Sequence, residues 1–154
     1  MTALAPISDG VVAIRPPIDG DAELLIAGRD TEFHRWLGAG TESPSPTGCI
    51  VVGREVVGWV DYDVDRQWLE PGEVNVGYNV FALHRGKGYA TRALELLLQH
   101  LEANTPYRTA TLLIDPQNGR SVAVAARTRF AAKGELNGQM YFTRSLRSGG
   151  AQAP

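Results

Sequence analysis

Residues 76–101, VGYNVFALHRGKGYATRALELLLQHL, join a strand to a long helix through a turn rich in glycine. Before the turn, apolar residues alternate with more polar ones over 73–81, which predicts a half-buried strand. After the turn, apolar residues recur every three or four positions, which predicts an amphipathic helix packed on a sheet. These helix residues are Ala90, Ala93, Leu94, Leu97 and Leu101.

The turn itself has the composition of an anion site. The first-turn N–H groups of a helix have no partner inside the helix, and Gly86 and Gly88 leave them uncovered. The positive end of the helix dipole and the neighbouring Arg85 and Lys87 favour a phosphate or pyrophosphate. A glycine-rich turn that only reverses the chain has the same spacing. A Walker loop is excluded because it needs serine or threonine after its lysine, whereas glycine follows Lys87. A dinucleotide-binding fingerprint is excluded because Thr91 stands where its third glycine is required.

Length and composition predict one globular domain, over residues 1–147, followed by a disordered tail at 148–154. The chain has 154 residues, 44% of them hydrophobic and 21% charged, and a formal net charge of −2. This charge gives no long-range attraction to nucleic acid or to a membrane. Cys49 is the single cysteine, so no intramolecular disulfide is possible. Because residues 1–10 lack the pattern of a signal peptide and no apolar run is long enough to span a membrane, we expect a cytoplasmic protein.

The rest of the chain interleaves strands and helices, which predicts an α/β fold without internal repeats. Turn residues separate the elements, as in the loop GTESPSPTG at 40–48. Further strands are expected at 11–15, 49–52, 55–65, 109–114 and 140–146, and helices at 19–27, 31–37 and 118–132.

Residues 85–90, RGKGYA, match the R-x-x-G-x-G/A signature of the GNAT superfamily of acetyl-CoA-dependent N-acetyltransferases. DPQNGRSVAVAARTRF, residues 115–130, resembles the second conserved segment of that family, which is built around N-x-x-S. Residues 11–25 and 30–38 resemble the amino-terminal part of the branch that acetylates ribosomal-protein N-termini. The resemblance covers roughly residues 10–146, and it implies direct transfer of an acetyl group to a primary amine, either a protein or peptide N-terminus or a small molecule.

The fold implied by this resemblance is a mixed, mostly antiparallel sheet of six to seven strands with about four helices. The pantetheine arm of acetyl-CoA would lie in a V-shaped opening between strands 73–81 and 109–114. Main-chain groups of Tyr78 and Val80 would hold that arm, and Asn118 would bond the arm or the acceptor. The pyrophosphate would sit beside Arg85 on the backbone amides of Gly86, Lys87, Gly88, Tyr89 and Ala90.

Acetyl transfer needs a base for the amine proton and an acid for the leaving thiolate. Glu73 is the candidate base, although the ribosomal-protein branch has its glutamate where this chain has Asn75. Ser121 is the candidate acid, because Ala125 stands where many relatives have a tyrosine. Plainer interpretations are a solvated or ion-paired Glu73 and a Ser121 that helps to cap its helix. These departures leave a second hypothesis, a non-catalytic module that binds acyl-CoA.

Other features suggest no metal site, and an acidic stripe on one strand is either solvated or draws a cationic acceptor toward the cleft. Asp61, Asp63 and Asp65 alternate on one strand, but Arg66 and Gly72 stand where a calcium loop needs glycine and glutamate. We therefore expect no metal. A third departure from the family is Arg129, which replaces the glycine of a common Gly-Phe pair and leaves the end of the 118–132 helix undefined. Phe33 and Trp36 would line the acceptor pocket or belong to the core. The sequence does not decide between a monomer and a homodimer.

Overall fold

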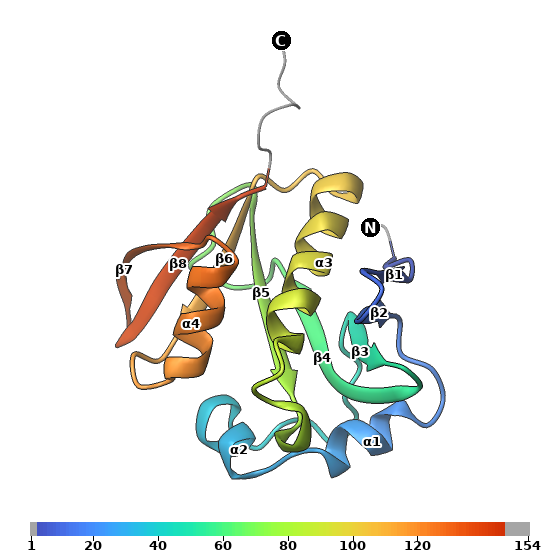
Figure 1. The fold of residues 1–154 in the computed structure, drawn as a ribbon. Coiled ribbons are helices and arrows are strands. Elements are labelled where there is room, and N and C mark those ends of the chain that lie inside the picture. Colours follow the sequence, from blue (N-terminus) through green and yellow to red (C-terminus); the bar gives the residue numbers. More distant parts are fainter. Residues whose placement is uncertain (1–2, 147–154) are drawn as a thin grey trace. The chain divides into compact units, whose positions relative to one another are not determined.

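The computed structural model describes residues 3–146, so the predicted tail at 148–154 lies outside the described part (Figure 1). The helices are α1 (Asp21–Ala27), α2 (Thr31–Leu37), α3 (Tyr89–Asn104) and α4 (Gly119–Arg127), with a short 3-10 helix, η1 (Ala82–His84). The strands are β1 (Ile7–Ser8), β2 (Ala13–Arg15), β3 (Gly48–Val52), β4 (Glu55–Asp63), β5 (Glu73–Val80), β6 (Thr109–Ile114), β7 (Ala131–Leu136) and β8 (Gln139–Ser145).

The strands form a mixed sheet in the order β1-β2-β3-β4-β5-β6-β8-β7. β5 and β6 run parallel, and the described registers of β1 with β2, β2 with β3, β3 with β4, β6 with β8 and β7 with β8 are antiparallel. The predicted α/β class, the mostly antiparallel sheet and the four helices are confirmed. The sheet has eight strands, more than the six to seven expected.

Contacts divide the described residues into two compact units, each of which contains part of β5 and part of α3. The first unit comprises residues 3–61 and 78–97, with β1, β2, β3, α1, α2 and η1. Its core contains Val12, Ile14, Ile50, Val57 and Leu94, all of which are fully buried. The second unit comprises residues 62–77 and 98–146, with β6, α4, β7 and β8. Its core includes Val74, Leu98, Leu101, Ala110 and Leu146.

The long helix α3 follows the predicted apolar spacing. Ala93, Leu94, Leu97 and Leu101 are fully buried, whereas Ala90 in the first turn is half-buried. Leu96 and Leu98 are also buried, so the covered face of α3 is wider than the predicted stripe. On β5 the predicted alternation holds for Val74, Val76 and Val80. Asn79 is buried as well, although its face of the strand was expected to be polar.

The predicted helix over 118–132 is too long, and the strand β7 was missed. α4 ends at Arg127 because Arg129 adopts a left-handed conformation, with φ 64°, and the amides of Arg129 and Phe130 donate back to the carbonyl oxygens of Ala126 and Ala125 at 3.1 and 2.9 Å. The chain turns there and continues as β7. That strand, AAKGEL, is exposed along nearly its whole length, so it lacks the apolar alternation that identifies a strand.

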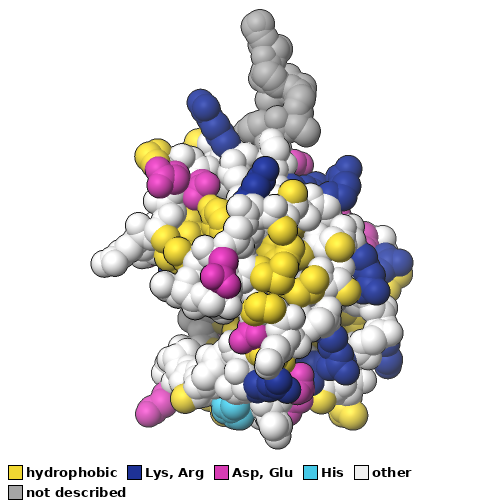
Figure 2. Space-filling model, turned by 90° about the vertical axis from the view of Figure 1, so that its left-hand side faces the viewer, with side chains coloured by type: hydrophobic (Ala, Val, Ile, Leu, Met, Phe, Trp, Pro, Cys, Tyr) yellow, Lys and Arg dark blue, Asp and Glu magenta, His cyan; other side chains and the backbone are white. Residues whose placement is uncertain are grey.

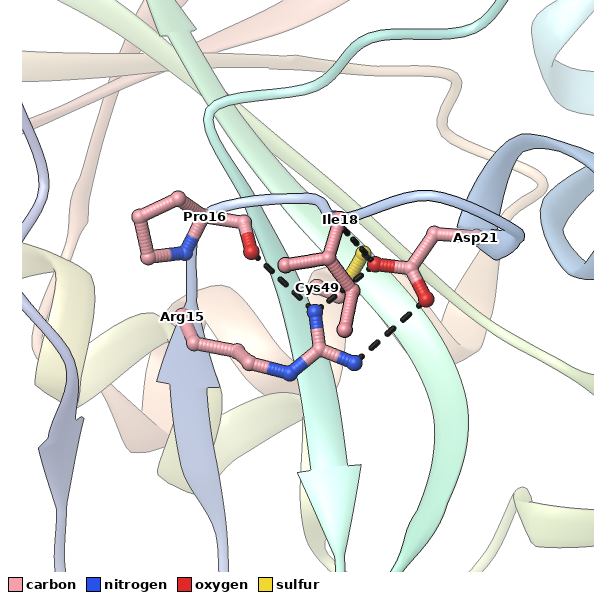
Figure 3. A network of polar contacts seen from close by, with 5 residues as sticks. All are labelled: Arg15, Pro16, Ile18, Asp21 and Cys49. Atoms are coloured by element: carbon pink, nitrogen blue, oxygen red, sulfur yellow. Dashed lines mark hydrogen bonds and ion pairs between the residues drawn. The ribbon is translucent and has the colours of Figure 1, made fainter.

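Cys49 belongs to a polar network in the first unit (Figure 3). Arg15 donates to Asp21 at 2.7 Å and to the carbonyl oxygen of Pro16 at 3.1 Å, and the amide of Ile18 donates to the same carboxylate at 2.8 Å. The buried thiol of Cys49 lies 3.5 Å from that carboxylate. Burial, and then the charge of Asp21, raises the pKa of Cys49 to about 12. The thiol therefore stays protonated at neutral pH, which agrees with a small buried residue and not with a nucleophile.

Charge is not concentrated on the face shown in Figure 2. Acidic and basic side chains both appear there, interrupted by hydrophobic ones, and neither sign covers the face. Within residues 3–146 no helix has both the length and the apolar character needed to cross a membrane.

Candidate functional site

The loop that begins α3 carries the predicted anion site, in the first unit. Gly86 and Gly88 have φ of +79° and +83°, values that L side chains rarely adopt, and no atom of residues 3–146 lies within 4 Å of where a Cβ would stand on either residue. Among the described residues, the amides of Gly86, Lys87 and Gly88 donate no hydrogen bond. Open backbone with unused donors at a helix start is what a bound phosphate needs. The geometry therefore favours an anion site over a turn that only reverses the chain.

Arg85, the first residue of the signature, is engaged by the protein itself. Its Nη1 and Nη2 donate to the two carboxylate oxygens of Asp30 at 2.7 and 3.0 Å, and its Nε donates to the carbonyl oxygen of Val80 at 2.9 Å. Hydrogen bonds from Arg85 are the main cause that lowers the pKa of Asp30 to about 2. Arg85 thus fixes the chain just before the glycines, and its proposed proximity to a pyrophosphate stays a prediction.

The end of β5 supplies the other two predicted cofactor residues of the first unit. Val80 is buried, and its carbonyl oxygen is the acceptor for Arg85. Tyr78 is half-buried. The role of their main-chain groups in holding the pantetheine arm stays a prediction. Next to them, the rings of His84 and Tyr89 lie 6.5 Å apart, on either side of the glycine loop in sequence.

Glu73, the candidate base, lies in the second unit and has a partner that the sequence did not suggest. The Tyr141 hydroxyl donates to both carboxylate oxygens of Glu73, at 3.1 and 3.2 Å, and the amide of Glu70 donates to one of them at 3.0 Å. The Trp68 ring stands nearly perpendicular to Tyr141, at 5.7 Å between centroids. Burial, and then the bond to Glu73, raises the pKa of Tyr141 to about 12. The phenol therefore stays protonated and holds the carboxylate in one place.

Asn75, at the position of the glutamate in the ribosomal-protein branch, is bonded to the neighbouring strand. The Thr111 hydroxyl donates to the side-chain oxygen of Asn75 at 3.1 Å. The parallel register of β5 with β6 contains three pairs, from Glu73↔Thr109 to Asn75↔Thr111, whereas β5 runs on to Val80 and β6 to Ile114. The pairing thus ends part-way along both strands, as a splayed pair requires.

Asn118 and Ser121 meet at the start of α4. Asn118 is the N-cap, and its side-chain oxygen accepts a hydrogen bond from the amide of Ser121 at 3.3 Å. The capping role that the sequence offered for Ser121 thus belongs to Asn118, with Ser121 as the donor. The predicted site residues lie in both units: Glu73, Asn118 and Ser121 in the second, and Tyr78, Val80 and Arg85–Ala90 in the first. Within residues 3–146 no group of three or more His, Cys, Asp or Glu side chains could hold a metal ion.

A family model for an acetyltransferase (GNAT) domain matches residues 12–131, which is most of the chain. The chain belongs to the GNAT acetyltransferase family. None of the curated proteins with which the sequence was compared matches it. The GNAT signature at 85–90 and the N-x-x-S segment at 118–121 both fall within the matched residues.

Solved structures give the same GNAT fold. A GNAT acetyltransferase from Bacillus anthracis superposes with a TM-score of 0.76 at 14% identity, over 92% of this chain and 98% of that one. The aminoglycoside acetyltransferase AAC(6')-Ib in complex with coenzyme A superposes with a TM-score of 0.74 at 17% identity, over 87% of this chain and 94% of that one. RimJ from Mycobacterium smegmatis, in complex with CoA-disulfide, superposes with a TM-score of 0.70 at 21% identity, over 87% of this chain and 81% of that one.

Proposed function

We propose that this GNAT protein transfers the acetyl group of acetyl-CoA directly to a primary amine. The observation that carries the proposal is the loop at 86–88, whose three amides are unused and whose glycines stand in open space. The matching loop of the family is the one that receives the CoA pyrophosphate. Support for the ligand comes from similar structures, since AAC(6')-Ib and RimJ were both solved with forms of coenzyme A.

Binding of acetyl-CoA, the acetyl donor, is assigned mainly to residues of the first unit. The amides of Gly86, Lys87, Gly88, Tyr89 and Ala90 bind the pyrophosphate, with the positive end of the α3 dipole adding to the attraction. Main-chain groups of Tyr78 and Val80 hold the pantetheine arm, and Asn118 of the second unit bonds the arm or the acceptor. None of these roles requires a metal.

Proton transfer is assigned to the second unit. Glu73 takes the proton that the attacking amine loses, through a water molecule, while the amine nitrogen bonds to the thioester carbon and the carbon–sulfur bond breaks. Tyr141 keeps the Glu73 carboxylate oriented, because its hydroxyl donates to both oxygens. Ser121 gives a proton to the leaving thiolate. Ser121 regains its proton from solvent water and Glu73 releases the amine's proton to solvent, so the net products are the acetylated amine and the free thiol of CoA.

The acceptor is a primary amine, either a protein or peptide N-terminus or a small molecule. Resemblance of residues 11–25 and 30–38 to the ribosomal-protein branch supports an N-terminus. The structure of AAC(6')-Ib with kanamycin supports a small-molecule amine, at 16% identity. The second candidate function, a non-catalytic acyl-CoA-binding module, is favoured by Asn75 and Ala125, which replace the two family residues that move protons.

A screen for turnover tests the proposal. Acetyl-CoA is mixed with panels of peptides and small amines, thiol release is followed, and products are identified by mass spectrometry. We expect release with at least one acceptor, and kcat lower by about 10²-fold in Glu73→Gln, the usual loss when a general base is removed. Glu135→Gln on the exposed strand β7 is the control, with unchanged kcat. Tight CoA binding without any acetylated product would favour the non-catalytic module.

A further inference from the structure

Two contacts tie the segment between α1 and α2 to the segment that precedes the glycine loop, within the first unit. Asp30 pairs with Arg85 through both carboxylate oxygens. Two residues earlier, Gly28 lies so close to Phe81 that a Cβ on Gly28 would come within 2.5 Å of the aromatic ring. These contacts join residues 28–30 to residues 81–85, which are more than 50 positions away in the sequence.

The Asp30 carboxylate serves two structures at once. As the N-cap of α2, it accepts a hydrogen bond from the amide of Phe33 at 3.0 Å on the same oxygen that receives Nη2 of Arg85. The other oxygen receives Nη1 of Arg85 at 2.7 Å. The side chain of Arg85 is only 15% exposed, so this pair is shielded more than a surface salt bridge. The start of α2 and the start of the glycine loop therefore share one charged group.

The glycine loop is held at its far end by α3, where the amide of Arg92 donates to the carbonyl oxygen of Gly88 at 3.1 Å. Within residues 3–146, no atom lies within 4 Å of a Cβ built on Gly86 or Gly88, so no neighbouring group packs over these two residues. Arg85 is the last residue before them with a fixed side chain, clamped by Asp30 on one side and by the carbonyl oxygen of Val80 on the other. The ion pair of Arg85 with Asp30 thus fixes the end of the loop that precedes the glycines.

We infer that Asp30 is a positioning residue for the phosphate-binding loop and that it couples CoA binding to the first turn of α2. The inference rests on the proposed function, because it takes the loop at 85–90 as the CoA site. Asp30 itself acts only through Arg85. Coupling between two sites is reciprocal, so CoA bound at the loop also stabilises the α2 amides that Asp30 caps.

Calorimetric titration with CoA tests the inference. Asp30→Asn keeps a side chain that caps helices well but removes the charge that holds Arg85. We expect CoA to bind about tenfold more weakly to this variant, within the usual range of coupling between sites. Asp63→Asn is the matched control, because it removes the same charge from the pair of Asp63 with Arg66 on the protein surface, and its CoA affinity should equal that of the wild type.

A second pair of measurements separates positioning from stability. Amide exchange at Phe33 should slow when CoA binds the wild type and should not respond to CoA in Asp30→Asn. Arg85→Lys keeps the positive charge but loses the two-pronged contact, so it should weaken CoA binding to a similar extent even if Asp30→Asn does not fold. The double variant should lose no more affinity than either single one, since both changes break one contact.

The outcomes distinguish the inference from the function on which it rests. Failure of the wild type to bind CoA would overturn the proposed function. Binding by the wild type, with affinities of Asp30→Asn and Arg85→Lys within twofold of it, would overturn the positioning role and leave the CoA site intact. A lower melting temperature with unchanged CoA affinity would assign Asp30 to stability alone.

Discussion

Gly88→Glu is the most direct perturbation of the phosphate site, because it adds a side chain and a negative charge where the proposed pyrophosphate binds. Gly88 has φ +83°, and no atom of residues 3–146 lies within 4 Å of its Cβ position, so the Cβ of the new side chain causes no clash. Its cost to folding is that of a left-handed residue other than glycine, about 1–2 kcal/mol. The loss of phosphate binding comes in addition to that cost.

Gly138→Glu provides a control with the same backbone cost. Gly138 lies in the turn between β7 and β8, has φ +84°, and also has nothing within 4 Å of its Cβ position. The two variants should therefore have similar melting temperatures without ligand, each roughly 2–8 °C below the wild type for a chain of this size. Any difference between them in the presence of CoA reports on the loop at 85–90.

Thermal unfolding with and without CoA is the assay. Ligand at about 100 times its Kd stabilises the folded state by about 2.7 kcal/mol. For a chain of this size, that corresponds to a rise in melting temperature of roughly 5–11 °C. Wild type and Gly138→Glu should show this rise, and Gly88→Glu should show none. An equal rise in Gly88→Glu would refute the assignment of the phosphate site to this loop.

Two further predictions concern stability. Arg129→Gly should raise the free energy of unfolding by up to about 1 kcal/mol in urea titrations, because glycine adopts the left-handed conformation at φ 64° without strain. The larger entropy of glycine in the unfolded state offsets part of this gain. A loss of stability would contradict this account of the α4 terminus. The pKa of Asp30 is about 2 in the folded protein and 3.8 unfolded, so its stabilising contribution is present above about pH 4 and lost as the pH falls toward 2. Because the Asp30 side chain is 29% exposed, we expect this contribution to the free energy of unfolding to be roughly 1 kcal/mol. It is measured as the difference in stability between wild type and Asp30→Asn. A difference that did not narrow between pH 6 and pH 2.5 would contradict the linkage.

The sequence was sufficient for features that depend on neighbours along the chain. The apolar stripe of α3 and the alternation of β5 are local periodicities, and both elements form where they were predicted. The glycine loop was predicted for the same reason, because its left-handed residues and free amides follow from two glycines ahead of a helix.

Features that depend on distant partners were not predictable from one sequence. Tyr141 and Glu73 are 68 positions apart, and Arg85 and Asp30 are 55 apart. Nothing in the local pattern around Tyr141 or Asp30 marks it as a partner. The predicted helix over 118–132 was wrong at its end because alanine-rich sequence continues past Thr128, and only the turn at Arg129 separates α4 from β7.

The bare loop of Gly86 and Gly88 also has a consequence for how the reaction is regulated. In the proposed assignment, its amides contact the pyrophosphate, a part of the cofactor that is identical before and after the acyl group is transferred. On that assignment the loop would hold free CoA as firmly as acetyl-CoA, and the product would compete with the donor for the same site. Turnover would then follow the ratio of acetyl-CoA to CoA around the protein more closely than the concentration of either one.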